Sequence, residues 1–305
     1  MNDPRADSGA QLDLFVLPYD PGLPLRDQRD VMERPFVSLA KSKRITPIDY
    51  TSPDGSVWVK VQPHQDYGMA TIWDADILIW AASILTEMRK RRANEVPRTI
   101  HFQPYDLLRS ICRPTGGREY RQLRDALARL QSTVVRTNIR AKGRRRERQF
   151  GWIEGWSDTV DEATGQSRGM SLTVSDWFYE GVMMDGGVLA VTPEYFDITG
   201  GRQRWLYRVA RKHAGGHGAE GFAVSLPTLF EKSGAEGSYR RFKFEMKRIA
   251  AANELPEFYL IWEDTGGKEP SLRMIRRAAL DFAHPGYELP KRSQPPKLRK
   301  VPQET

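Results

Sequence analysis

The segment YRQLRDALARL at residues 120–130 returns later in the chain as YRRFKFEMKRI at residues 239–249. In each copy a Tyr-Arg pair opens the segment, and large apolar residues follow three, seven and ten residues after the tyrosine. This spacing matches the period of a helix with one apolar face. The two copies therefore predict two helices with the same role in two related domains.

The repeat extends upstream of both helices and covers more than fifty residues. The further matching segments are residues 77–92 and 104–110 in the first copy, and residues 202–213 and 227–233 in the second. A chain of 305 residues is long enough for two domains that each bury a core. The repeat thus predicts two folding units in tandem.

The first copy has the pattern of a helix-turn-helix. One helix is predicted to begin near Asp74, a short helix to span residues 104–112, and a long helix to span residues 118–132. A Pro-Thr-Gly-Gly turn separates the last two helices, as the motif requires. Asp74 and Asp76 are interpreted as residues that start the first helix.

Strand patterns surround the predicted helices. The predicted strands are residues 57–61 in an early hairpin, 133–139, 150–156 and 170–174 after the first helix-turn-helix, and 258–262 and 271–275 after the second. A basic loop at residues 142–146 joins the strands 133–139 and 150–156. A β-hairpin with a basic tip directly after a helix-turn-helix predicts a winged helix, with residues 170–174 as the third strand of its sheet.

The long helix of each copy is predicted to present basic side chains on its outer face. The inward positions are Tyr120, Leu123, Leu127 and Leu130 in the first copy, and Tyr239, Phe242, Met246 and Ile249 in the second. Arginine bonds guanine bidentately when a helix lies in the major groove. The candidates for base contact are Arg118, Arg121, Gln122, Arg240 and Arg241.

Further basic residues complete the predicted DNA-binding surface. The remaining candidates on the two helices are Arg124, Arg129, Lys243, Lys247 and Arg248, and those of the basic loop are Lys142, Arg144, Arg145 and Arg146. The loop residues are expected to contact phosphate or the minor groove. Each feature has a simpler interpretation, as an amphipathic surface helix or a solvated loop. Residues 89–92 either complement a helix dipole or contact phosphate.

Composition narrows the class of partner. The net charge is +8 and the pI about 9.5, which favours a polyanion. Cys112 is the single cysteine, so no internal disulfide is expected, and no apolar run is long enough to cross a membrane. The N-terminus does not resemble a signal peptide. We expect a soluble bacterial protein of the cytoplasm, associated with nucleoid or plasmid DNA.

Motifs for catalysis and cofactor binding are missing from the sequence. It contains no GxxxxGK[ST] segment, HExxH segment, His-x-His segment or paired CxxC. His213 and His217 lie close together in a glycine-rich helix end, which is interpreted as a loop and not as a metal site. We therefore expect a protein that acts without a cofactor and is not an enzyme. A relaxase or nuclease is the alternative from another class.

The predicted fold is α+β, with two tandem winged-helix domains that each consist of a helix-turn-helix and a β-hairpin wing. The predicted boundaries are a flexible N-terminal tail at residues 1–34, a first winged-helix domain at 35–180, a second at 181–284, and a basic, proline-rich C-terminal tail at 285–305.

Three segments also carry a family resemblance. DYGMATIWDADILIWAAS at residues 66–83, residues 101–135 and residues 191–215 resemble the replication initiator protein A family of plasmids and related mobile elements. The resemblance covers about residues 36–284. It implies binding to origin repeats (iterons), control of plasmid copy number, and recruitment of the host replication initiator and the replicative helicase.

The resemblance also implies a switch between two states of assembly. Proteins of this kind bind origin repeats as monomers and repress their own promoter as homodimers. A winged-helix transcriptional repressor without an initiation role is the second hypothesis, because it would use the same double-stranded DNA-binding surface. Replication of a plasmid that carries only this gene and its repeats would distinguish the two.

Overall fold

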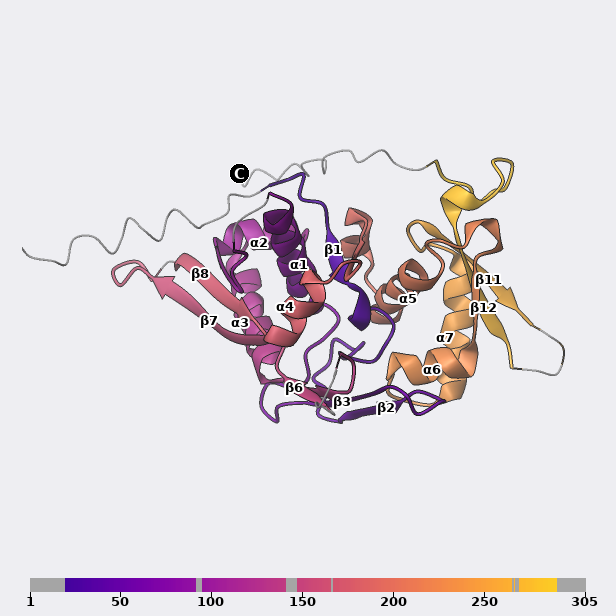
Figure 1. The fold of residues 1–305 in the computed structure, drawn as a ribbon, viewed down its shortest axis with the longest axis horizontal. Coiled ribbons are helices and arrows are strands. Elements are labelled where there is room, and N and C mark those ends of the chain that lie inside the picture. The colour runs from indigo at the N-terminus through magenta and orange to yellow at the C-terminus, as the bar shows by residue number, and fades with distance from the viewer. Residues whose placement is uncertain are drawn as a thin grey trace, which may run out of the picture.

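The computed structural model describes residues 20–91, 95–140, 147–165, 167–264, 266 and 269–289. Within these residues, helices combine with antiparallel sheets, which confirms the predicted α+β class. Two units, each with helices and a three-stranded sheet, lie toward opposite ends of the long axis (Figure 1). The buried apolar side chains of both units belong to one continuous cluster, so the two units pack against each other.

The first unit has the order helix, strand, helix, helix, strand, strand. Its elements are α1 (Ala75–Lys90), β4 (Thr99–Phe102), α2 (Pro104–Ser110), α3 (Gly117–Ser132), β7 (Ile153–Val160) and β8 (Ser167–Val174). The strand order of its sheet is β4-β8-β7, and the neighbouring strands are antiparallel. The three predicted helices are confirmed. However, α2 ends before Cys112, which has a left-handed backbone conformation with φ of 56°.

The second unit repeats this order. Its elements are α5 (Gly201–His213), β10 (Phe222–Ser225), α6 (Leu226–Ser233), α7 (Tyr239–Ala252), β11 (Phe258–Glu263) and β12 (Ser271–Arg276). The strand order β10-β12-β11 is equivalent to that of the first sheet. The internal repeat predicted from the sequence is therefore confirmed in the order of the elements and in their pairing.

A third sheet lies beside the first unit. Its strands are β2 (Ile48–Thr51), β3 (Trp58–Gln62), β5 (Val134–Thr137) and β6 (Arg148–Phe150), paired in the order β2-β3-β5-β6. The predicted early hairpin is confirmed as β2 and β3, which are joined by a turn with Gly55 at φ of 70°. The basic residues 142–146 lie between β5 and β6 in sequence, outside the described residues.

The predicted hairpin around the basic loop is wrong in one respect. Residues 150–156 do not form one strand, because β6 ends at Phe150 in the four-stranded sheet and β7 begins at Ile153 in the sheet of the first unit. The strand predicted at residues 170–174 lies in β8 and pairs with β7 and β4, not with β5 or β6. The hairpin of the first unit is therefore β7–β8, whose turn carries Asp161 and Glu162.

Between β6 and β7 the chain leaves the four-stranded sheet and enters the sheet of the first unit, and Gly151 and Trp152 explain why it does so. A Cβ atom on Gly151 would lie 2.7 Å from the carbonyl oxygen of Gln131, so a larger residue could not pass this close to the end of α3. Trp152 is 1% exposed and makes edge contacts with Phe36 and Trp177. Burial of this indole interrupts the strand and redirects the chain.

The remaining elements connect the two units. They are β1 (Arg26–Gln28), α4 (Asp176–Met183), β9 (Val188–Ala190) and the short 3₁₀ helices η2 (Arg29–Val31), η3 (Pro193–Asp197), η4 (Gly218–Glu220) and η5 (Arg277–Ala279). The strand β1 pairs with β9 and lies between α1 and α5 (Figure 1). The predicted domain boundary at residue 180 falls inside α4.

The segment from Leu25 to Arg34 lies in the fold, not in the predicted N-terminal tail. Leu25, Val31 and Met32 are buried, and the buried charges of Asp27 and Glu33 pair with cations on α5. The sequence suggested a tail because residues 1–34 are rich in Pro and Asp and contain few large apolar residues. Its charges become compatible with burial only through partners that are distant in sequence.

Candidate nucleic-acid interface

Helix α3 separates its two faces as the sequence predicts. Leu123, Leu127 and Leu130 are fully buried, and the side chains of Arg118, Arg121 and Gln122 are exposed on the first two turns. Within the described part of the chain, neither Arg118 nor Arg121 forms an ion pair. These two guanidinium groups are therefore free to bind an anion or a base edge from outside.

The two other predicted arginines of α3 bind carboxylates of the protein. Arg124 donates two hydrogen bonds to Asp158 on β7, at 2.9 and 2.5 Å. Arg129 binds both oxygens of Asp74 at 2.8 Å, and this hydrogen bonding raises the pKa of Arg129. These contacts hold α3 against the sheet and against the start of α1, so both arginines support the position of the helix.

Helix α7 is built in the same way and has stronger caps. The Ser238 hydroxyl accepts from the backbone N–H of Arg241, and Asn253 ends the helix in a left-handed conformation while its amide pairs with the backbone of Leu260. Phe242 and Met246 are fully buried. These features fix the rotation of α7 and determine which residues it exposes.

The outer face of α7 carries the predicted cations. Arg240, Arg241, Lys247 and Arg248 are exposed. Arg241 pairs with Glu245 one turn away, at 3.1 Å, a surface contact that contributes little to stability. Among the described residues, Arg240, Lys247 and Arg248 have no carboxylate partner. This face is therefore more basic and less neutralised than the corresponding face of α3.

Some of the other residues predicted to contact DNA form ion pairs within the protein, and the rest lie outside the described residues. The Lys243 ammonium pairs with Glu269 at 3.1 Å, and the same carboxylate accepts from the Tyr239 hydroxyl at 2.6 Å. Arg89 pairs with Asp185 and Arg91 with Glu87 at the end of α1. The loop candidates Lys142, Arg144, Arg145 and Arg146 lie outside the described residues, as does Arg92.

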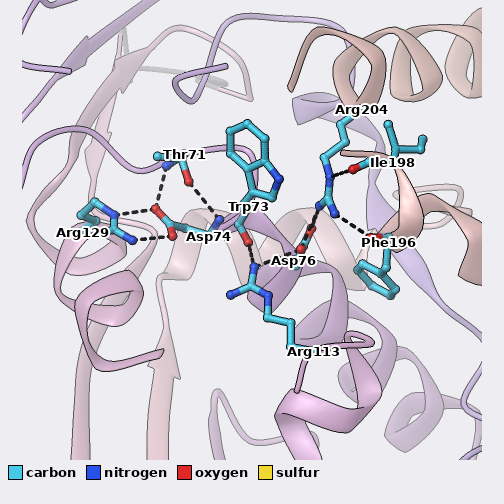
Figure 2. A network of polar contacts seen from close by, with 9 residues as sticks. All are labelled: Thr71, Trp73, Asp74, Asp76, Arg113, Arg129, Phe196, Ile198 and Arg204. Carbon is cyan, nitrogen blue, oxygen red and sulfur yellow. Dashed lines mark hydrogen bonds and ion pairs between the residues drawn. The ribbon is translucent and has the colours of Figure 1, made fainter. Parts of the chain in front are cut away.

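A network of buried ion pairs joins the two units near these helices (Figure 2). Asp76 on α1 accepts from Arg204 of α5 at 2.7 and 2.9 Å, and from Arg113 of the α2–α3 turn at 3.1 Å. Arg204 also donates to the backbone carbonyls of Phe196 and Ile198. Arg204 is 4% exposed and Asp76 1%, so this pair crosses the contact between the units inside the protein.

Asp74, which was interpreted as a residue that starts the first helix, does not cap α1 through its side chain. It stands at the N-cap position of α1, but its side chain accepts no bond from a backbone N–H within the helix. Its carboxylate instead accepts from the backbone N–H of Thr71 at 2.8 Å and from Arg129. The start of α1 thus holds α3 through Asp74 and α5 through Asp76 (Figure 2).

Two buried acidic residues of the N-terminal segment pair with cations on α5 and α6. Arg208 binds Asp27 on β1 at 2.6 and 3.0 Å, and both side chains are 3% exposed. Glu33 binds Lys212, His213 and Lys232 at 2.8, 2.7 and 2.5 Å. Burial opposes the charge of Glu33, but the hydrogen bond from His213 and the two ammonium groups lower its pKa far below the usual value.

His213 thus has a structural role. Its Nε2 atom lies 2.7 Å from Glu33, and its ring stacks on Phe222 with a centroid distance of 4.9 Å. His217 contacts the same phenylalanine ring at 5.3 Å. In the part of the chain that the structure describes, no group of three or more His, Cys, Asp or Glu side chains is placed to hold a metal ion.

Comparison with known proteins places the chain in a family. The model of the family described as "Replication initiator protein A" matches residues 26–260. The chain belongs to the replication initiator protein A family. The match begins at β1 and ends in β11, so it includes the first unit, the helices of the second unit and the buried ion pairs of Arg204 and Arg208, but not β12.

A curated relative agrees with this assignment, and two solved structures share the fold. A protein of Wigglesworthia glossinidia brevipalpis, described as "Putative replication protein", is 32% identical over 239 residues, which cover 76% of this chain and 84% of that protein. A selenomethionine crystal structure of domains 2 and 3 of RctB has a TM-score of 0.53 at 13% identity, covering 79% of this chain and 95% of that one. A second structure of these RctB domains has a TM-score of 0.50 at 13% identity, with coverages of 81% and 96%.

In this member of the family, sequence reasoning missed the ion pairs that join the units. Arg204 and Arg208 are one helical turn apart on α5 and flank Trp205 and Tyr207, which are buried. Cations inside an apolar helical face are the signal that could have identified them, since such residues are buried only with a partner.

Among the described helices, none is long and apolar enough to span a membrane.

Proposed function

We propose that this family member is a sequence-specific double-stranded DNA-binding protein with two tandem winged helices that acts at a replication origin. The order helix, strand, helix, helix, strand, strand supports this proposal in both units. In this arrangement α3 and α7 are the recognition helices, and the hairpins β7–β8 and β11–β12 are the wings. The basic loop at residues 142–146 is then a separate phosphate contact beside the first unit.

One observation carries the proposal. Arg121 and Arg240 occupy equivalent positions of the repeat, and both are exposed without an ion-pair partner among the described residues. No packing contact or ion pair within the described residues accounts for an arginine at the same place on both helices. An arginine near the N-terminal half of a recognition helix can bind the O6 and N7 atoms of guanine.

The buried ion pairs support binding to two half-sites by one chain. Arg204–Asp76 and Arg208–Asp27 hold α5, and with it the second unit, against the first. The two recognition helices then keep a constant distance and orientation. A rigid pair of related helices in one chain favours half-sites in direct repeat, since the chain itself has no two-fold axis.

Membership of the family supports the biological role. We propose binding to repeats at a plasmid-type origin, recruitment of the host replication initiator and the replicative helicase, and control of copy number through repression of its own promoter by a homodimer. In this role the protein acts stoichiometrically, without a cofactor or catalytic step, in association with DNA in the bacterial cytoplasm.

Binding measurements with matched variants test the DNA contacts. The affinity of Arg121→Ala and of Arg240→Ala for DNA that flanks the gene should fall by about 1–3 kcal/mol each, while affinity for random duplex changes little. Arg29→Ala removes an exposed cation outside both helices and should leave both affinities unchanged. Equal losses on specific and random DNA would show that these arginines do not read sequence.

A replication assay separates initiation from repression. A plasmid that carries only this gene and its flanking repeats should replicate in a permissive host, and the Arg121→Ala/Arg240→Ala variant should not support it. If the intact plasmid fails to replicate while the protein still represses its promoter, the chain is a repressor.

A further inference from the structure

The ring of Phe244 on α7 is exposed to solvent. Its exposed fraction is 67%, the highest among the large apolar side chains of the described helices, and the next is Tyr105 at 43%. An exposed phenylalanine is a poorer helix former than alanine or lysine. Neither the stability of α7 nor its packing therefore explains this residue.

Phe244 lies at the centre of the cationic face. At about 100° per residue, Arg240, Arg241, Lys247 and Arg248 fall within an arc of roughly 120°, and Phe244 is in its middle. All four of these cationic side chains are exposed. The partner that best fits this face is therefore a polyanion that also offers an apolar group to the ring.

The major groove of DNA has these properties. Its phosphates attract the flanking cations, and the C5-methyl group of thymine is its apolar feature. We propose that Phe244 contacts the methyl group of one thymine and makes α7 select an A·T pair at that position. The inference rests on the proposed function, because it assumes that α7 lies in the major groove.

Helix α3 has no aromatic residue at the position equivalent to Phe244. The residue of α3 that is equivalent to Phe244 in the repeat is Asp125, which is also exposed. A carboxylate can accept a hydrogen bond from cytosine N4 but makes no apolar contact with a methyl group. The two half-sites therefore differ at this position, and the effect of the thymine methyl group is confined to the half-site that α7 binds.

Replacement of thymine by deoxyuridine tests the contact, since it removes only the methyl group. The probe is the duplex that the full-length chain enriches from a random double-stranded library. One dT→dU change in one half-site should weaken wild-type binding about fourfold, the equivalent of about 0.8 kcal/mol for one buried methyl group. The Phe244→Ala variant should bind the dT and dU duplexes equally.

Control variants and alternative outcomes keep the test decisive. Phe282→Ala removes a ring that is 83% exposed and lies outside the helices and strands of both units, and its response to dU should match that of the wild type. If Phe244→Ala weakens binding while no dU change does, the ring acts as a wedge or stacking surface and the proposal is overturned. If no sequence is enriched at all, the proposed function fails together with this inference.

Discussion

Neutralising Asp76 should destabilise the whole protein. In the Asp76→Asn variant, Arg204 stays 4% exposed without its counter-charge, and Arg113 loses its contact at 3.1 Å. Removing one partner from a buried ion pair costs about 3–5 kcal/mol. That is a large part of the roughly 5–15 kcal/mol by which domains are stable. At about 2–4 °C per kcal/mol for a protein of this size, the Tm should fall by about 6–20 °C.

Urea unfolding and calorimetry measure this change, with Asp49→Asn as the matched control. Asp49 also pairs with a cation, Lys60 at 3.1 Å, but its side chain is 65% exposed, so its loss should cost about 0–1 kcal/mol. The double variant Asp76→Leu/Arg204→Met should recover most of the stability, because an apolar pair replaces a buried ionic one without leaving a charge. Equal effects of Asp76→Asn and Asp49→Asn would refute the structural role of this network.

Three further predictions concern the other ion pairs and the candidate contacts. The lowered pKa of Glu33 stabilises the folded protein at pH values above 4.5, the ordinary pKa of glutamate. The free energy of unfolding should therefore decrease as the pH falls below about 4.5. Urea titrations at a series of pH values should show a shallower decrease for Glu33→Gln. Arg129 and Arg248 occupy equivalent positions of the repeat. Arg129→Ala should mainly lower the Tm, whereas Arg248→Ala should mainly weaken DNA binding. Equal changes of Tm and of DNA affinity in the two variants would contradict these different roles. Arg145→Ala should weaken binding to all DNA sequences alike and reduce the slope of log affinity against log salt by about 1, and a sequence-dependent loss would assign it to base contact.

The parts of the fold that local patterns determine were predictable. The spacing of Leu123, Leu127 and Leu130 set the buried face of α3, and the repeat carried that result to Phe242 and Met246 on α7. The helices of both units and the last two strands of the second unit followed from the same patterns, whereas the strands β4 and β10 were not predicted. These apolar residues pack into the core of their own unit, so their burial does not depend on how the two units are arranged.

Features that depend on distant partners were not predictable. The run around Trp152 resembles one strand, and only the buried aromatic contacts with Phe36 and Trp177 show that the chain changes sheets there. A helical wheel places Arg129 on the outer face, but it cannot show that Asp74 binds it from the start of α1. The pairing of charges across the contact between units is a property of the tertiary structure and leaves no periodic signal.

Footprinting of the full-length chain on the duplex that flanks its own gene tests the central claim most directly. At physiological salt and with competitor DNA, the chain should protect several direct repeats, each as two segments about one helical turn, or roughly 10 base pairs, apart. The Arg121→Ala variant should lose one segment of each pair and Arg240→Ala the other. Absence of protection, or a single inverted repeat over the promoter, would contradict origin recognition by two linked helices.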